Sequence, residues 1–261
     1  MNVLITVFLA AFALFLYMHA AFALAIIFKR NDIADVAWGP GFLVVAMAGF
    51  IVVGFHPAGI LVASMVALWS LRLSFYLFAR MLRTQEDGRY QRWRIAWGRY
   101  ATVRAWAQVF MLQGLILLIV ALPVAIITAD PVGAISIVAI IGALVWTAGL
   151  IFETVADIQL RHFLVVPEHR NRVMTTGLWH YTRHPNYFGE VVSWWGIGIM
   201  ALAFPYGWIA LVGPALLTVL ILKVSGVPLV EERYRDNAEY QEYKMVTNTF
   251  LPWSPRAQAK H

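Results

Sequence analysis

Long apolar runs separated by short polar connections dominate the pattern of the chain. About 20 consecutive apolar residues cross the hydrocarbon core of a bilayer as a helix. Runs of this kind lie at about residues 3–28, 34–55, 58–79, 106–128, 131–155, 184–204 and 207–228. The pattern therefore predicts an all-α polytopic membrane protein, in which residues 1–261 form a single domain with seven transmembrane helices.

The composition indicates that lipid is the main solvent of the chain. Of 261 residues, 61% are hydrophobic and only 13% are charged, which is outside the range of soluble domains. There is no cysteine, which excludes disulfides, thiolate metal sites and thiol nucleophiles. His180 and His184 stand four residues apart, but two histidines near a basic interface are more often surface residues, so we expect no metal.

Apart from Arg72 and Lys223, which lie inside predicted spans, the Lys and Arg residues occupy alternate connections between the apolar runs. They follow the first run, occupy residues 80–104 and 161–183, and recur after residue 228, whereas the connections at 54–59, 129–133 and 204–207 carry none. Cationic connections lie in the cytosol. We therefore expect an integral membrane protein with its N-terminus outside and its C-terminus in the cytosol. The net charge of +6 then reports topology, and no nucleic acid is expected as a partner.

Two cytosolic segments flank the spans. Residues 80–105 interleave Arg with Trp and Tyr, as in an amphipathic helix lying on the inner leaflet. The alternative is that some of these Arg residues face a cofactor. Residues 229–261 form a cytosolic tail.

Ionisable residues inside spans are costly and mark either a function or a paired structural contact. Arg72 is about 10 Å from the cytosolic end of its predicted span, from the rise of a helix. It shares a helical face with Trp69, Tyr76, Arg80 and Arg83. The stripe leads towards the cytosol, although Arg72 paired with a carboxylate for packing alone is the alternative.

Similar stripes occur in other spans at four-residue spacing. They comprise Glu153, Asp157 and Arg161 at the end of the fifth run and in its continuation, and Asn186, Glu190 and Trp194 at the start of the sixth. The first stripe alternatively belongs to an exposed helix end with ordinary ion pairs. Asp35 opens the second span, where it is either a functional acid or a helix cap. Because these residues and Arg172 all fall on the cytosolic side, one pocket with an active site facing the cytosol accounts for them.

An apparent nucleotide motif in the sixth span is rejected. GIGIMA at 196–201 matches G-x-G-x-x-A, but it lies within an apolar run and no strand precedes it. Its small residues are better interpreted as a helix-packing surface.

The string RHPNYFGE at 183–190, followed by a closing span and the tail EYQEYKMVTNTFLPW, resembles the C-terminal half of the membrane-embedded steroid 5α-reductase superfamily. DVAWGPGF at 35–42 resembles its bacterial branch, which implies an integral protein of a bacterial inner membrane. The R-H-P-N-Y-x-G-acid string is also similar to the signature of the sterol C14 and Δ7 reductases. The resemblance covers about 150–253 well and 31–83 more thinly.

The resemblance implies NADPH bound at the cytosolic side and reduction of the C=C bond of an enone in a lipophilic, steroid-like substrate. Asp35 falls where the family keeps its catalytic Glu, and it would donate the proton to the carbonyl oxygen. The assisting tyrosine of the family aligns with Trp69, whose indole cannot replace a phenol, so Tyr76 or a water is expected to assist. The residues expected at the cofactor are Arg72, Arg80, Arg83, Glu153, Asp157, Arg161, Arg172, Tyr181, Asn186, Glu190 and Trp194. The family's basic residues at the end of span seven are replaced here, leaving only Lys223.

A second enzyme class shares part of the pattern. Isoprenylcysteine carboxyl methyltransferases also carry R-H-P-x-Y-x-G and a tail with E-Y-x-x-Y, and they bind S-adenosylmethionine. The number of Arg residues favours a dinucleotide with phosphates, because adenosylmethionine has none. A non-catalytic transport or lipid-binding protein is the third interpretation, but the sequence lacks its midplane charges and related halves. The expected partners are a lipophilic small molecule entering from the bilayer and lipid, with no obligate protein partner.

Overall fold

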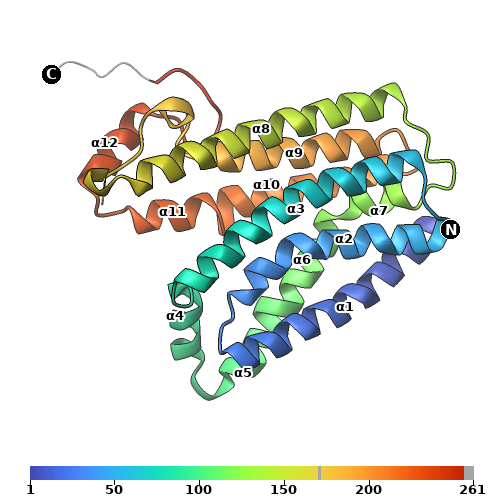
Figure 1. The fold of residues 1–261 in the computed structure, drawn as a ribbon, viewed down its shortest axis with the longest axis horizontal. Coiled ribbons are helices and arrows are strands. Elements are labelled where there is room, and N and C mark those ends of the chain that lie inside the picture. Colours follow the sequence, from blue (N-terminus) through green and yellow to red (C-terminus); the bar gives the residue numbers. More distant parts are fainter. Residues whose placement is uncertain (170–171, 256–261) are drawn as a thin grey trace. The chain divides into compact units, whose positions relative to one another are not determined.

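A computed structural model describes residues 1–169 and 172–255, and these residues form helices and connections without strands (Figure 1). Within this described part, six helical stretches are long and apolar enough to cross a membrane: Asn2–Phe28, Ile33–Val53, Pro57–Arg83, Gly88–Val120, Ile137–Val165 and Gly207–Arg233. The predicted sixth run forms α9 (Pro185–Ala201), whose 17 residues are at the short end of the range that spans a bilayer. The prediction of an all-α, multi-pass integral membrane protein is confirmed. The count of seven spans, the orientation and the single domain stay predictions.

The chain folds into two compact units, each with most of its contacts within itself. Unit 1 comprises Met1–Ala139 and Met200–Gly213, and unit 2 comprises Ile140–Ile199 and Pro214–His261. Each unit contains its own apolar helices and its own polar cluster.

Unit 1 is built around α2 (Ile33–Val53). This helix packs against α1 (Asn2–Phe28) and α3 (Pro57–Arg83), and also against α6 (Leu112–Val120) and α7 (Leu122–Thr128) (Figure 1). Small residues on α2 allow this close approach. A Cβ added at Gly49 would lie 2.2 Å from Oγ1 of Thr128, so only glycine fits there.

A proline in the middle of α2 is accommodated by side chains from its neighbours. Pro40 has no N–H to offer to Val36 O, four residues earlier. The hydroxyl of Ser74 in α3 donates to this carbonyl at 3.1 Å. The hydroxyl of Tyr17 in α1 donates to Ala37 O at 2.8 Å. Because lipid cannot satisfy backbone groups, these bonds fix the first half of α2 between α1 and α3.

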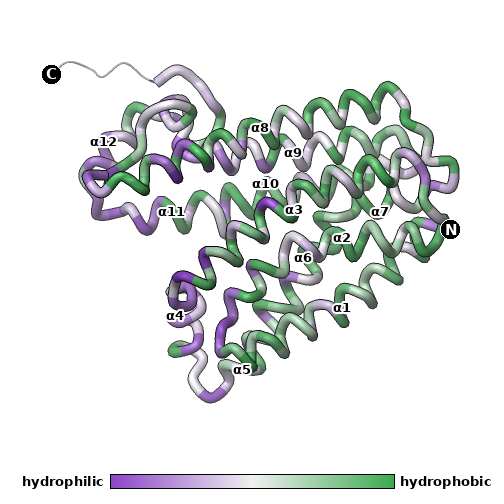
Figure 2. The backbone as a smooth tube through the Cα atoms, viewed as in Figure 1, coloured by the Kyte–Doolittle hydropathy of each residue, from purple (hydrophilic) through white to green (hydrophobic). Residues whose placement is uncertain are grey.

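The chain between α3 and α6 is helical but changes direction. Helix α4 (Gly88–Trp97) ends at Gly98, whose φ of +49° suits glycine. A single 3₁₀ turn, α5 (Ala101–Arg104) and a π-helix over Ala105–Met111 then lead into α6. The predicted amphipathic segment 80–105 therefore comprises the end of α3, α4 and α5, and Figure 2 shows it as hydrophilic beside the hydrophobic α1 and α2.

Unit 2 contains a close helix pair, α8 (Ile137–Val165) and α9. Glycines form the contact: a Cβ at Gly149 would lie 2.5 Å from Ser193 N, and one at Gly196 would lie 2.4 Å from Trp146 N. The interpretation of GIGIMA as a helix-packing surface is thus confirmed at Gly196. Helix α8 has 29 residues, about 44 Å at the helical rise, so it is longer than the hydrocarbon core of about 30 Å.

The last apolar run of the chain is interrupted. After α10 (Val212–Val219), a π-helix over Leu220–Val224 is followed by a break, and α11 (Val227–Arg233) continues the run. Trp195 in α9 donates to the hydroxyl of Thr218 in α10 at 3.1 Å, which ties these helices together. Helix α12 (Ala238–Val246) follows in the tail.

Candidate functional site

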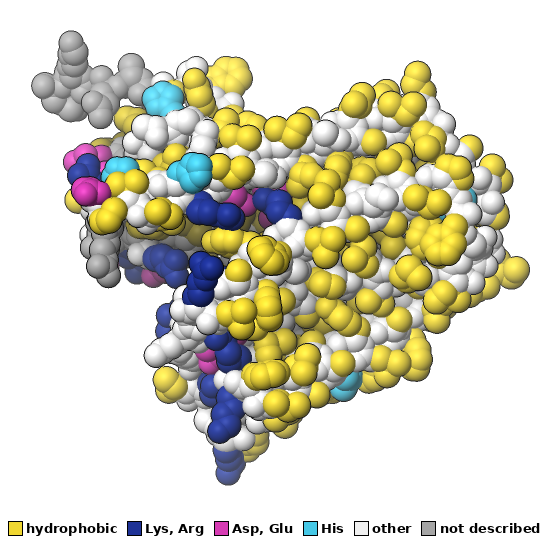
Figure 3. Space-filling model, in the orientation of Figure 1, with side chains coloured by type: hydrophobic (Ala, Val, Ile, Leu, Met, Phe, Trp, Pro, Cys, Tyr) yellow, Lys and Arg dark blue, Asp and Glu magenta, His cyan; other side chains and the backbone are white. Residues whose placement is uncertain are grey.

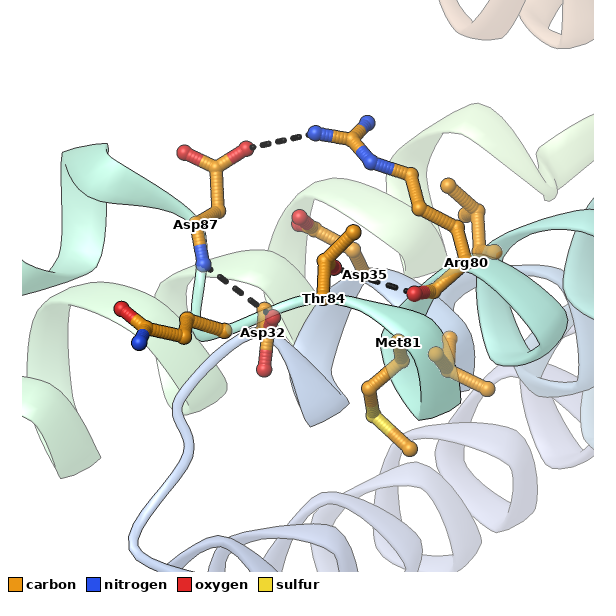
Figure 4. Close-up of a pocket in the computed structure, with 9 residues that line it drawn as sticks. Asp32, Asp35, Arg80, Met81, Thr84 and Asp87 are labelled. Atoms are coloured by element: carbon orange, nitrogen blue, oxygen red, sulfur yellow. Dashed lines mark hydrogen bonds and ion pairs between the residues drawn. The ribbon is translucent and has the colours of Figure 1, made fainter.

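The polar end of unit 1 brings together two segments about 55 residues apart in sequence, the entry to α2 and the turn between α3 and α4. Carboxylates and guanidinium groups pair there, and their residues are Asp32, Asp35, Glu86, Asp87, Arg30, Arg80, Arg89 and Arg94. Figure 4 shows part of this cluster around a small pocket. We call these eight residues the unit 1 polar cluster.

Arg30 fastens the α1–α2 connection to the end of α3. Its guanidinium forms a two-bond pair with Asp32, at 3.0 and 2.7 Å, and donates to Met81 O at 2.7 Å and Thr84 O at 2.8 Å. The two carbonyls lie at the C-terminus of α3, where backbone acceptors lack helical partners. Arg30 therefore caps α3 and fixes the position of Asp32 at the same time.

Asp35 is held by two donors from α4. Arg89 Nη2 lies 3.0 Å from Oδ2, and the phenol of Tyr90 donates to Oδ1 at 2.7 Å. The side chain of Asp35 is 30% exposed, whereas Tyr90 is 4% exposed. The carboxyl of Asp35 thus reaches the surface of the cluster while Tyr90 lies behind it. An ordinary cap for α2 would bond the backbone of its own helix, and these bonds go to another helix.

Asp87 links α3, α4 and the entry to α2. Its backbone N–H donates to Asp32 Oδ2 at 3.2 Å, and Arg80 Nη2 lies 3.5 Å from its carboxylate. Burial by itself raises the pKa of Asp87. Hydrogen bonds from the backbone and side chain of Arg89, with the charges of Arg89 and Arg80, outweigh burial and leave the pKa below its ordinary value. Asp87 is therefore an anion at neutral pH.

The pocket in this cluster is small. Its lining includes Asp32, Asp35, Arg80, Met81, Thr84 and Asp87 (Figure 4). Its volume of about 30 Å³ has room for roughly one water-sized group. Asp35 can therefore meet a single oxygen atom here, but a whole steroid does not fit in this pocket.

The other residues predicted on α3 occupy different environments. Trp69 is 2% exposed, and its ring packs edge-on against Phe42 at 5.7 Å between centroids. Tyr76 is 49% exposed, so it is not enclosed with Asp35 in the unit 1 polar cluster. Arg72 is half-buried and Arg83 is exposed on the same helix. The structure brings only Arg80, of the predicted α3 residues, into the pocket lining with Asp35.

Unit 2 places two of the predicted cofactor residues side by side. Asn186 at the start of α9 donates from Nδ2 to Asp157 Oδ1 in α8 at 3.2 Å. Its other amide atom accepts from Tyr187 N at 3.0 Å, which fixes the orientation of the amide. Glu153, one turn before Asp157, is 4% exposed and lies beside Gly189, where a Cβ would be 2.7 Å from its own Cβ.

The remaining predicted residues of unit 2 lie around this pair or in the tail contacts. Arg161 and Tyr181 are exposed, Glu190 is half-buried and Trp194 is 2% exposed. Arg172, 65% exposed at its side chain, bonds Glu239 of α12 at 3.2 Å. Arg172 thus has a carboxylate partner of its own.

Arg183, the first residue of RHPNYFGE, connects the tail to α9 and α11. It is 5% exposed, and its guanidinium lies 2.6 Å from Glu231 Oε1, 2.6 Å from Thr247 O and 2.8 Å from Thr249 Oγ1. Lys244 bonds the second oxygen of Glu231 at 2.8 Å. We call these five residues the tail clamp. Sequence reasoning missed it, because the Arg of the motif gave no sign of its distant partners.

The fold and these sites define an integral, multi-pass, all-helical membrane protein with a polar cluster in each compact unit. The chain belongs to the family described as protein of unknown function (DUF1295), whose family model matches residues 21–247. No curated protein and no solved structure matches the chain.

Proposed function

We propose that this protein is an NADPH-dependent reductase of a C=C bond conjugated to a ketone, acting on a lipophilic, steroid-like substrate that enters from the bilayer. The observation that carries the proposal is the bonded Asp35–Tyr90 pair beside a pocket with room for one oxygen atom. A carboxyl and a phenol placed together in an apolar protein can stabilise or protonate the oxygen of an enone.

The proposal includes seven spans with the N-terminus outside. Two features support it. Helix α9 packs along its length against the spanning helix α8 through Gly149 and Gly196, and its 17 residues match the lower limit for a span. The Lys and Arg residues of alternate connections favour a cytosolic location for the unit 1 polar cluster and the tail.

Asp35 would act as the acid of the reaction. It lines the pocket, so in its protonated form it can donate its proton to the carbonyl oxygen of the enone as hydride adds to the double bond. Tyr90 bonds the other side of the carboxyl and is buried, so it orients Asp35. Tyr90 thereby takes the assisting role for which the sequence offered Tyr76 or a water.

The residues of unit 2 fit a dinucleotide by their chemistry. The Asp157 carboxylate and the Asn186 amide form a fixed pair of acceptors and donors suited to ribose hydroxyls or a carboxamide. Arg161 lies one turn beyond Asp157 on α8 and carries the charge that a phosphate needs. When bound, NADPH would supply the hydride. Asp157, Asn186 and Arg161 would hold the NADPH molecule. Glu190 and Trp194 continue the same face of α9.

The number of Arg residues distinguishes the reductase from the methyltransferase alternative less clearly in the structure than in the sequence. Arg80 pairs with Asp87 and Arg172 pairs with Glu239, so fewer Arg residues are available for phosphates than the sequence alone implies. The Asp35–Tyr90 pair favours the reductase, because methyl transfer from adenosylmethionine to a carboxylate requires no proton donor.

Turnover of a 3-oxo-4-ene steroid by the purified protein tests the proposal. We expect Asp35→Asn to lower kcat by at least about 100-fold, the usual contribution of a general acid, with NADPH affinity unchanged. Tyr90→Phe should lower kcat and shift the pH–rate profile, because the phenol orients the acid. Tyr76→Phe is the matched control and should behave as wild type. Full turnover in Asp35→Asn would remove the proposed acid.

A further inference from the structure

Segment 80–105, which includes α4 and α5, has an inner side and an outer side that differ in charge. Glu86 and Asp87 are the acids of residues 80–105, and both point inwards, with side chains only 6% and 17% exposed. Each is paired with arginine in the unit 1 polar cluster. The exposed charged residues of this segment are therefore all arginines, namely Arg80, Arg83, Arg92, Arg99 and Arg104.

Large apolar side chains are exposed between these arginines. Ile95 is 82% exposed, Val103 is 65% exposed and Trp93 is 43% exposed. The guanidinium of Arg99 lies 4.7 Å from the centre of the Tyr100 ring, which is itself half exposed. Figure 3 shows Lys and Arg side chains gathered along this end of unit 1. The surface is thus cationic and apolar at once, with the acids on its inner side.

We propose that this α4–α5 surface, formed by Arg92, Trp93, Ile95, Arg99, Val103 and Arg104, binds the headgroups of anionic phospholipids. Arginine beside an exposed aromatic or aliphatic side chain suits a bilayer interface, where phosphates lie next to acyl chains. Nucleic acid would also meet the charge, but it offers no apolar layer for Ile95 and Val103. The charge complementarity and the apolar side chains together point to a lipid surface of the phosphatidylglycerol kind.

Lipid bound here would have a structural consequence for unit 1. The opposite face of α4 carries Arg89 and Tyr90, which bond Asp35. Headgroups on the outer face would hold α4 in place and so maintain those bonds. The proposal rests on the surface alone and stands whether or not the protein is a reductase.

Energy transfer from a dye on α4 to labelled lipid measures this binding locally. The chain has no cysteine, so Ala96→Cys at an exposed position of α4 gives a single labelling site. The protein is placed in phosphatidylcholine vesicles that contain acceptor-labelled phosphatidylglycerol or, for comparison, acceptor-labelled phosphatidylcholine. We expect phosphatidylglycerol to be enriched at the dye at least fivefold over phosphatidylcholine, because one surface cation contributes about that factor.

Charge variants decide between a local site and a general effect. Arg92→Gln/Arg104→Gln should remove at least fivefold of the preference, whereas Arg92→Lys/Arg104→Lys should keep it, since headgroup attraction needs charge more than bidentate geometry. Arg233→Gln/Arg235→Gln, which changes the net charge equally in unit 2, should leave the signal at α4 unchanged. Equal enrichment of both lipids in the wild type would overturn the proposal. So would an unchanged preference in the Gln variant, or displacement of phosphatidylglycerol by a random-sequence RNA duplex.

Discussion

Replacing Arg183 by alanine should release α12 and residues 247–249 from the rest of unit 2 while leaving the spanning helices folded. Arg183 is 5% exposed and its guanidinium joins α9 to Glu231 of α11 and to Thr247 and Thr249 of the tail. Without the guanidinium, Glu231 loses one of its cationic partners. The carbonyl oxygen of Thr247, a residue only 5% exposed, loses the donor that lies 2.6 Å from it.

The size of the effect follows from these contacts. Removing one partner of a buried ion pair costs about 3–5 kcal/mol. Lys244 still bonds the second oxygen of Glu231 at 2.8 Å, so we expect the lower end, about 3 kcal/mol. Since about 1.4 kcal/mol is a factor of ten, local opening of the tail should become about 100-fold more frequent.

Hydrogen exchange measured by mass spectrometry on α12 and residues 247–250 reports this opening. Arg235→Ala is the matched control, because its ion pair with Glu232 is exposed on both sides, at 69% and 59%, and such pairs contribute little. We expect about 100-fold faster exchange in Arg183→Ala and less than threefold change in Arg235→Ala. A change below threefold in Arg183→Ala would refute the reasoning that the tail depends on this clamp.

Three further outcomes test other parts of the fold. Ser74→Ala should cost about 1 kcal/mol in the wild type and almost nothing in a Pro40→Ala background, where the backbone N–H replaces the hydroxyl; equal melting shifts in both backgrounds would disprove this. Gly196→Val should separate α8 from α9, because its Cβ would lie 2.4 Å from a backbone nitrogen, and monodisperse elution at wild-type yield would count against that contact. The lowered pKa of Asp87 means that its stabilisation of α4 is complete above the unfolded value of about 3.9 and is lost as pH falls through the lower folded value. Amide exchange in α4, corrected for intrinsic rates, should therefore accelerate below about pH 4 in the wild type but not in Asp87→Asn.

The helices of the apolar runs were predictable, and their reasons are local. The first run was placed at 3–28 and the second at 34–55, against observed helices Asn2–Phe28 and Ile33–Val53. Lys29 and Arg30 separate them, and Gly54 ends the second with a φ of +83°. Such charges and glycines can be recognised without knowing what the helices pack against.

The interruptions within runs were not predictable in the same way. The π-helix over Leu220–Val224 and the break before α11 lie in a mostly apolar run, in which Lys223 is the only charged residue. Apolar character sets whether a segment lies in lipid, but not how its backbone bonds are arranged. Gly226 is a residue of the sequence that indicated a break in this run. In the structure a Cβ at this position would lie 2.6 Å from Ile221 O, so the break requires glycine.

The sequence identified several residues of the candidate site, but it did not show which of them form hydrogen-bonded pairs. Asp35 was recognised as an acid that needs an explanation, and Asn186 and Asp157 were assigned, on polar stripes of two different spans, to one cytosolic pocket. Tyr90 was missed because its bond to Asp35 joins segments 55 residues apart, and in segment 80–105 only arginines were considered as residues that face a site. Pairings of this kind depend on which helices are neighbours, and one sequence does not carry that information.

Titration of the detergent-purified protein with NADPH, followed by nicotinamide fluorescence, tests the central proposal most directly. Adenosylmethionine is titrated in parallel by calorimetry, and Asn186→Ala serves as the variant that removes the amide bonded to Asp157. We predict saturable NADPH binding, weakened at least about tenfold in Asn186→Ala by the loss of about 1.4 kcal/mol, and no adenosylmethionine binding. Binding of adenosylmethionine alone would contradict the reductase and place the protein with the methyltransferases.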